Sequence, residues 1–153
     1  LEVKRQYLKR DGSVANLMAV PQGETLFVEL KVKNGAAEVR NAAIVDRVPA
    51  GFEIEAVVND ETAKSFPFLA KLTPTRMVEG RDDRFFAALT MGRRPYRSWW
   101  DDDDKNGNVY HVAYIVRAVT PGTFALPAVN VSDMYSPRVF ARSPMGSVTI
   151  VPR

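Results

Sequence analysis

At 153 residues, with 46% hydrophobic and 25% charged residues, the chain has the size and composition of one globular domain rather than of a disordered or membrane protein. It has no cysteine, which excludes disulfides, thiolate metal sites and thiol nucleophiles. The net charge of +3 is small and spread along the chain, so nucleic-acid binding is not expected. No apolar run approaches the ~20 residues that cross a bilayer, so no direct membrane insertion is expected either.

Seven short segments combine the alternation and the β-favouring composition that predict strands. In chain order they cover residues 25–33, 39–48, 52–57, 84–91, 109–119, 123–131 and 147–151. Asn34-Gly35 tolerates positive φ and predicts a tight hairpin that joins the first two segments as antiparallel strands. In the third segment, alternation predicts that Phe52, Ile54 and Ala56 share the apolar face and lie opposite the two glutamates. The fifth is so rich in β-branched and aromatic residues that it predicts a central strand.

A single short helix is expected between residues 60 and 72, where the apolar residues have helical spacing and Pro67 limits the length to about one or two turns. Short strands separated by turn residues, with at most one short helix, predict an all-β fold. The expected architecture is an antiparallel two-sheet β-sandwich of the immunoglobulin or fibronectin type. We expect residues 1–153 to form a single domain. Because the chain opens on Leu-Glu-Val, without methionine or leader, we expect a fragment of a longer polypeptide.

Few side chains in the sequence suit catalysis. His111 is the only histidine, so a Ser-His-Asp arrangement would have to use it. It lies in the middle of a predicted strand, which favours a packed or surface histidine over a catalytic one. We therefore expect neither enzyme activity nor a cofactor.

An acidic segment follows the fourth predicted strand. Asp102-x-Asp104-x-Asn106 matches the first half of a calcium-binding loop, with oxygen ligands at alternate positions. The position that should hold the closing glutamate is Ala113, so a solvated acidic turn is favoured and calcium is the alternative. No metal is predicted.

Three guanidinium groups and three aromatic rings lie together just before the acidic segment. They belong to Arg93, Arg94, Tyr96, Arg97, Trp99 and Trp100. This composition suits a protein partner, a sugar or an anion, and the alternative is a loop that covers one end of the sandwich. Nucleic acid is disfavoured because no second basic cluster supports it. An independent sugar- or anion-binding β-sandwich module is therefore one functional alternative.

A methionine and a tyrosine, Met134 and Tyr135, lie between the last two predicted strands, where loops are ordinarily polar. Such large, adaptable side chains suit an exposed contact surface. The alternative is a tyrosine that caps the core from a corner of the sandwich. The chemistry of the two residues leaves both possibilities open.

Blocks of this sequence resemble, in the same order, the C-terminal macroglobulin-like domain, MG10, of bacterial alpha-2-macroglobulins. They are residues 46–55 (Asp-Arg-Val-Pro-Ala-Gly-Phe-Glu-Ile-Glu), 81–84 (Arg-Asp-Asp-Arg), 113–127 and 133–137 (Asp-Met-Tyr-Ser-Pro), followed by Ala141-Arg142 and Gly146. The resemblance implies a macroglobulin-like β-sandwich at the C-terminal end of a larger, protease-trapping defence protein. It implies a non-catalytic interaction domain.

The resemblance also implies partners and a location. In such proteins a protease cleaves a bait segment and becomes trapped, and a reactive thioester can attach it covalently. Met134 and Tyr135 would then contact the thioester domain as a lock that keeps water from the thioester. The implied partners are other domains of the parent protein, proteases through the full-length protein, and in addition another envelope protein. The implied location is the periplasm or cell envelope of a Gram-negative bacterium, with an anchor to the inner membrane through a missing N-terminus as one option.

Overall fold

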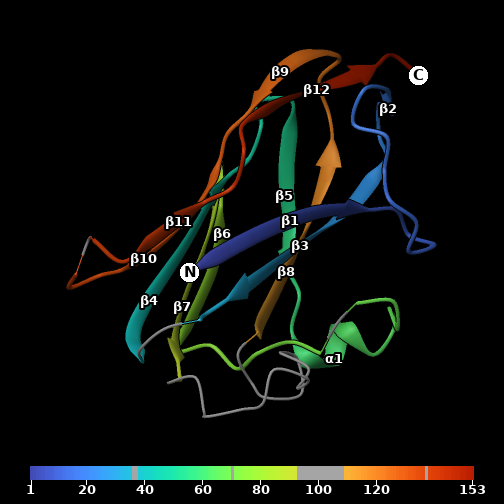
Figure 1. Cartoon of the computed structure of the whole chain (residues 1–153). Coiled ribbons are helices and arrows are strands. Elements are labelled where there is room, and N and C mark those ends of the chain that lie inside the picture. The colour runs from blue at the N-terminus through green and yellow to red at the C-terminus, as the bar shows by residue number, and fades with distance from the viewer. Residues whose placement is uncertain (36–37, 70, 93–108, 137) are drawn as a thin grey trace, which may run out of the picture.

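The computed structural model describes residues 1–35, 38–69, 71–92, 109–136 and 138–153. These residues form strands and one turn of helix (Figure 1). In chain order the elements are β1 (Glu2–Leu8), β2 (Val20–Pro21), β3 (Thr25–Lys33), β4 (Val39–Arg47), β5 (Phe52–Val57), α1 (Asp60–Ala63), β6 (Met77–Arg81), β7 (Arg84–Met91), β8 (Val109–Ala118), β9 (Gly122–Leu126), β10 (Val129–Asp133), β11 (Phe140–Arg142) and β12 (Gly146–Val151). The single short helix confirms the prediction.

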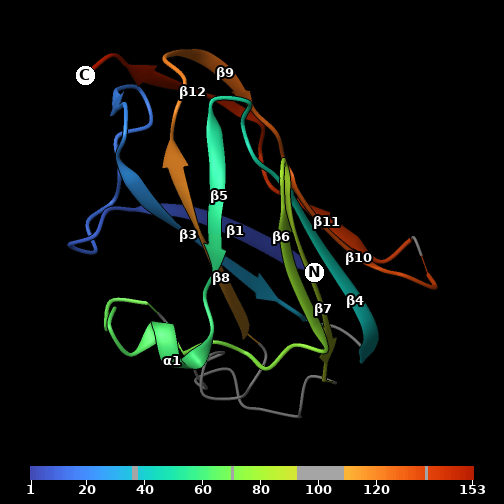
Figure 2. The same cartoon turned by 180° about the vertical axis from the view of Figure 1, so that it is seen from behind.

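Two larger sheets face each other across one core (Figures 1 and 2). The four-stranded sheet has the order β1-β3-β8-β5, and the five-stranded sheet has the order β11-β10-β4-β7-β6. A three-stranded sheet, β2-β12-β9, closes one end of the sandwich, and β2 pairs with β12 in parallel. The all-β antiparallel sandwich is confirmed, and the third sheet is an addition that the sequence did not predict.

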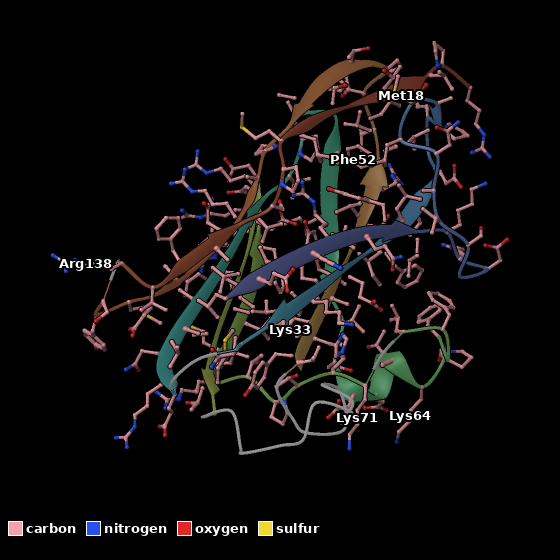
Figure 3. All side chains as sticks on the ribbon, viewed as in Figure 1. Met18, Lys33, Phe52, Lys64, Lys71 and Arg138 are labelled. Atoms are coloured by element: carbon pink, nitrogen blue, oxygen red, sulfur yellow. The ribbon has the colours of Figure 1, made fainter. Side chains whose placement is uncertain are left out.

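Alternating side chains of the facing sheets build the core. The inward aliphatic residues of β3 are Leu26, Val28, Leu30 and Val32, all fully buried. Tyr114 of β8 stacks on Phe85 of β7, with ring centroids 4.6 Å apart, and so joins the two sheets. Phe52 of β5 also points into the core (Figure 3). β8 lies between β3 and β5, as expected for the central strand.

A buried carboxylate connects the N-terminal strand to the opposite sheet. Asp46 of β4 accepts a hydrogen bond from the Tyr114 hydroxyl and another from the Arg5 guanidinium, both at 2.5 Å. Arg5 also donates to the carbonyl oxygen of Pro127 at 2.8 Å. Burial raises the pKa of the Asp46 carboxyl, and the positive charge of Arg5 opposes that shift. The Arg5–Asp46 pair therefore neutralises charge inside the core.

The hairpin expected at Asn34-Gly35 is wrong. β3 lies in the four-stranded sheet and β4 in the five-stranded sheet, so the connection crosses between sheets. Asn34 is buried, and its side-chain amide donates to the carbonyl oxygen of Gly92 at 3.2 Å. Asparagine is favourable in a tight turn, but here Asn34 stabilises the crossover between the two sheets. Its side-chain amide provides a hydrogen-bond donor for the backbone carbonyl of Gly92.

The strand expected over residues 123–131 is in fact two strands. β9 pairs with β12 in the three-stranded sheet, whereas β10 pairs with β4 and β11 in the five-stranded sheet. The chain changes sheets after Leu126, where Pro127 lacks the N–H that a continuous ladder would need.

The prediction that Ala56 shares a face with Phe52 and Ile54 is also wrong. An irregularity in the pairing of β5 with β8 falls between Ile54 and Ala56, so that Ala56 is exposed and Val57 pairs with the core residue Tyr114. One extra residue in a strand exchanges the faces of all residues after it.

The outer faces of the two large sheets differ. On the four-stranded sheet, Phe27 is covered by Phe66 and Phe68 from the segment that follows α1, with ring centroids 4.4 and 5.5 Å away. Asn59 caps the N-terminus of α1, because its side chain accepts from the backbone N–H of Thr62 at 2.8 Å. On the five-stranded sheet, no helix or strand among the described residues covers the outer face (Figures 1 and 2).

Candidate functional site

The Met-Tyr loop, residues 134–136, follows β10 in the connection to β11, and its backbone N–H groups form hydrogen bonds. The N–H of Met134 donates to the carbonyl oxygen of Asn41 at 2.9 Å. The carboxylate of Asp133 accepts from the N–H of Tyr135 at 3.0 Å, which is the geometry of an Asx turn. The loop backbone is thus fixed at the edge of the five-stranded sheet.

The side chains of this loop point into solvent. Tyr135 is 80% exposed and Met134 is 46% exposed. Val139, further along the same connection, and Phe140, the first residue of β11, are also exposed. The Arg142 guanidinium lies over the Phe140 ring at 5.9 Å. Arg138 lies at the far end of this hairpin and points away from the body of the protein (Figure 3). The exposure excludes the alternative in which Tyr135 caps the core.

A hollow of about 450 Å³ lies beside the loop, and Met134, Phe140 and Arg142 are among its lining residues. Exposed apolar side chains around a hollow are typical of contact surfaces rather than of sites for chemistry. The sequence patterns do not indicate Phe140 and Arg142 as site residues. The apolar pair Val139-Phe140, close after Pro137 in a turn region, was the signal that could have indicated them.

The backbone of His111 pairs with Thr73. Its N–H donates to the Thr73 hydroxyl at 2.9 Å, and its carbonyl oxygen accepts from the N–H of Thr73 at 2.9 Å. These bonds attach the segment after α1 to β8. Within the part of the chain that the structure describes, no group of three or more His, Cys, Asp or Glu residues could hold a metal ion.

Two sets of residues predicted from the sequence lie outside the described residues. They are Arg93, Arg94, Tyr96, Arg97, Trp99 and Trp100 of the partner loop, and Asp102, Asp104 and Asn106 of the calcium alternative. Both stay predictions. In the described ranges, no helix is long and apolar enough to span a membrane.

The family described as "Bacterial Alpha-2-macroglobulin MG10 domain" matches residues 1–98 and 100–138 of the chain. The chain belongs to this family. Alpha-2-macroglobulin of Escherichia coli K12 is 31% identical to this MG10 domain over 148 residues, covering 90% of the domain and 8% of the E. coli protein. Alpha-2-macroglobulin of Xylella fastidiosa 9a5c is 29% identical and covers 99% of the domain and 9% of its own length.

Solved structures agree with this assignment. Salmonella alpha-2-macroglobulin reacted with methylamine matches with a TM-score of 0.77 at 29% identity. The native conformation of E. coli alpha-2-macroglobulin matches with a TM-score of 0.78 at 27% identity. Each match covers 99% of the MG10 domain and 9% of the larger chain, so the domain spans less than a tenth of these relatives. The macroglobulin-like fold is therefore confirmed. The family is also non-catalytic, which confirms the prediction that the chain is not an enzyme.

Proposed function

We propose that this MG10 domain is a non-catalytic interaction domain of a protease-trapping alpha-2-macroglobulin, and that its Met-Tyr loop contacts the thioester domain of the parent protein. The observation that carries the proposal is the exposed pair Met134 and Tyr135 on a backbone fixed by hydrogen bonds. A fixed backbone lowers the conformational entropy that is lost on binding. A ring and a thioether can together exclude water from a reactive group.

Solved structures of relatives support the part of the proposal that concerns proteases. E. coli alpha-2-macroglobulin is described as activated by trypsin in one structure and by porcine elastase in another. The Salmonella protein is described as having reacted with methylamine, which is a nucleophile. We propose that the parent of this domain responds to proteases in the same way. Since the relatives come from Gram-negative bacteria, we also propose that the parent lies in the periplasm or cell envelope.

The contact can be tested with the chain and the separately purified thioester domain of its parent. Met134→Ala and Tyr135→Ala should each weaken the affinity, measured by isothermal titration calorimetry, by about tenfold or more, as expected for exposed side chains that become buried anchors. Met145→Ala is the control, because Met145 is a methionine outside the loop and is as exposed as Tyr135. If Tyr135→Ala binds as tightly as the wild type, or if Met145→Ala weakens binding equally, the loop is not the contact.

An inhibition assay with the isolated domain distinguishes the role of the domain from that of the parent protein. Since the proposal assigns trapping to the full-length protein, the 153-residue chain should leave trypsin activity on a protein substrate unchanged at stoichiometric amounts. Inhibition by the domain alone would contradict the proposal.

A further inference from the structure

Three arginines form one row across the outer face of the five-stranded sheet. Arg47 of β4 lies opposite Arg84 of β7, and Arg84 lies opposite Arg81 of β6. The chain neighbours Asp46 and Phe85 are buried in the core, so the side chains of Arg47 and Arg84 lie on the outer face. Directly opposite residues have Cβ atoms about 5 Å apart, and like charges at that spacing repel each other. This arginine row, Arg47, Arg84 and Arg81, is therefore unfavourable by itself.

Only part of this charge is neutralised by the described residues. Arg81 pairs with Glu79 at 2.5 Å. Neither Arg47 nor Arg84 forms an ion pair with any acid in the described ranges, although Asp82 and Asp83 of the β6–β7 turn line the same hollow. As far as the described residues go, these two adjacent guanidinium groups are thus available to a ligand.

The arginine row borders a hollow of about 760 Å³. Val45, Phe86 and Met77 provide its apolar part, and Met77 is 52% exposed. Val45 lies opposite Phe86, one pleat along from the Arg47–Arg84 pair, so apolar and cationic groups occupy neighbouring rows of the same face. The segment after α1 covers comparable apolar side chains on the other large sheet, whereas the described residues leave this face open.

We propose that the arginine row binds an extended, carboxylate-rich segment of a partner polypeptide. Arg47 and Arg84 would each take a carboxylate through paired N–H groups, because the planar guanidinium fork matches the two oxygens. An apolar side chain of the same segment would fill the hollow against Phe86. Binding of carboxylates would remove the repulsion along the row. A flat anionic membrane fits less well, because Glu79, Asp82 and Asp83 at the same edge would face it.

This surface is separate from the Met-Tyr loop. Met134 bonds to Asn41, near the start of β4, whereas Arg47 is the last residue of that strand. At about 3.3 Å per residue, the two surfaces are roughly 20 Å apart along β4. Failure of the thioester-domain test would therefore leave this proposal standing, and the reverse also holds.

The test uses the chain and a short fluorescent peptide of mixed glutamate and leucine, with binding measured by fluorescence anisotropy. We expect saturable binding that weakens as salt is added, and no binding of a matched peptide with glutamine in place of glutamate. The double variant Arg47→Ala/Arg84→Ala should bind the acidic peptide about tenfold or more weakly. Arg47→Lys/Arg84→Lys should also bind it more weakly, because an ammonium group cannot form the paired bonds.

A stability measurement distinguishes binding from a structural role. Arg84→Ala should leave the melting temperature unchanged or raise it, because it removes repulsion on both sides of Arg84. Arg117→Ala is the matched control, since Arg117 is an exposed arginine on the outer face of the other large sheet, and it should bind the peptide normally. Absence of saturable binding, an equal loss with Arg117→Ala, or a clear fall in melting temperature with Arg84→Ala would overturn the proposal. So would tighter, Arg84-dependent binding to phosphatidylglycerol vesicles.

Discussion

Asp46 shows how one buried carboxyl makes the stability of this domain depend on pH. Burial raises its pKa above the ordinary value of 3.8, so the folded chain keeps the proton at pH values at which the unfolded chain has lost it. The free energy of unfolding therefore receives its largest contribution from Asp46 at low pH, and this contribution falls as pH rises toward the folded pKa. Above that pKa the carboxylate is charged inside the core, where Arg5 and Tyr114 compensate for its lost hydration.

Arg5→Met should therefore be strongly destabilising at neutral pH. It leaves the Asp46 carboxylate buried without its cation, a change that costs about 3–5 kcal/mol of unfolding free energy. Urea denaturation measures this loss, which should shrink as the pH is lowered and Asp46 becomes protonated. Arg40→Met is the control, because Arg40 pairs with Glu38 at the surface with 76% of its side chain exposed, and it should change stability by less than about 1 kcal/mol. A loss that is the same at all pH values would contradict this role for Arg5.

Single strands differ in how well their sequence predicts them. β3 has aliphatic residues at alternate positions and was predicted with its observed bounds. β1 was missed because the inward position between Val3 and Tyr7 is Arg5, a charged residue whose partner Asp46 is 41 residues away. β6 was missed because most of its residues are exposed at a sheet edge, so burial imposes no alternation. Alternation therefore predicts strands that bury one face with aliphatic residues, and it fails where a distant partner compensates for a charge.

The connection between β4 and β5 offers a test at the level of elements. A Cβ atom on Gly51 would lie 2.3 Å from a ring carbon of Phe124 and 2.8 Å from Ile150, both in the three-stranded sheet. Gly51→Ala should therefore force β9 and β12 away from this turn and cost about 1–3 kcal/mol, measured by thermal or urea denaturation. Gly146→Ala is the matched control, because its nearest contact would be an ordinary 3.8 Å from Leu126. Equal effects of the two substitutions would show that the three-stranded sheet does not pack closely on Gly51.

At the scale of the whole molecule, two properties limit what the sequence can reveal about function: which side chains are exposed, and which residues of paired strands lie opposite each other. Met134 and Tyr135 were identified from their residue types alone, and their exposure then selected between two readings. The arginine row could not be identified in this way. Arg47 and Arg84 are 37 positions apart, and they become neighbours only through the pairing of β4 with β7.

We propose that residues 1–153 fold as a single domain, and calorimetry can test this. The first strand pairs with β3, the last pairs with β2 and β9, and residues of all three sheets share one core. Heating should therefore give one transition in which the calorimetric and van't Hoff enthalpies agree. Arg5→Met and Gly51→Ala should each lower the midpoint of that one transition. Two resolved transitions, or enthalpies that disagree, would contradict the single domain.

The pairing of β3 with β8 also matters during synthesis of the chain. Lys33, the last residue of β3, pairs with Val109. The edge of β3 that pairs with β8 therefore has no partner until the ribosome has made most of the chain. At about 5–20 residues per second, the nascent strand waits for several seconds. During that time its regular row of aliphatic residues can pair with other chains. Alternation with Glu29, Lys31 and Lys33 places charge beside those residues throughout the delay, so the pattern that builds the finished sheet also protects it while translation continues.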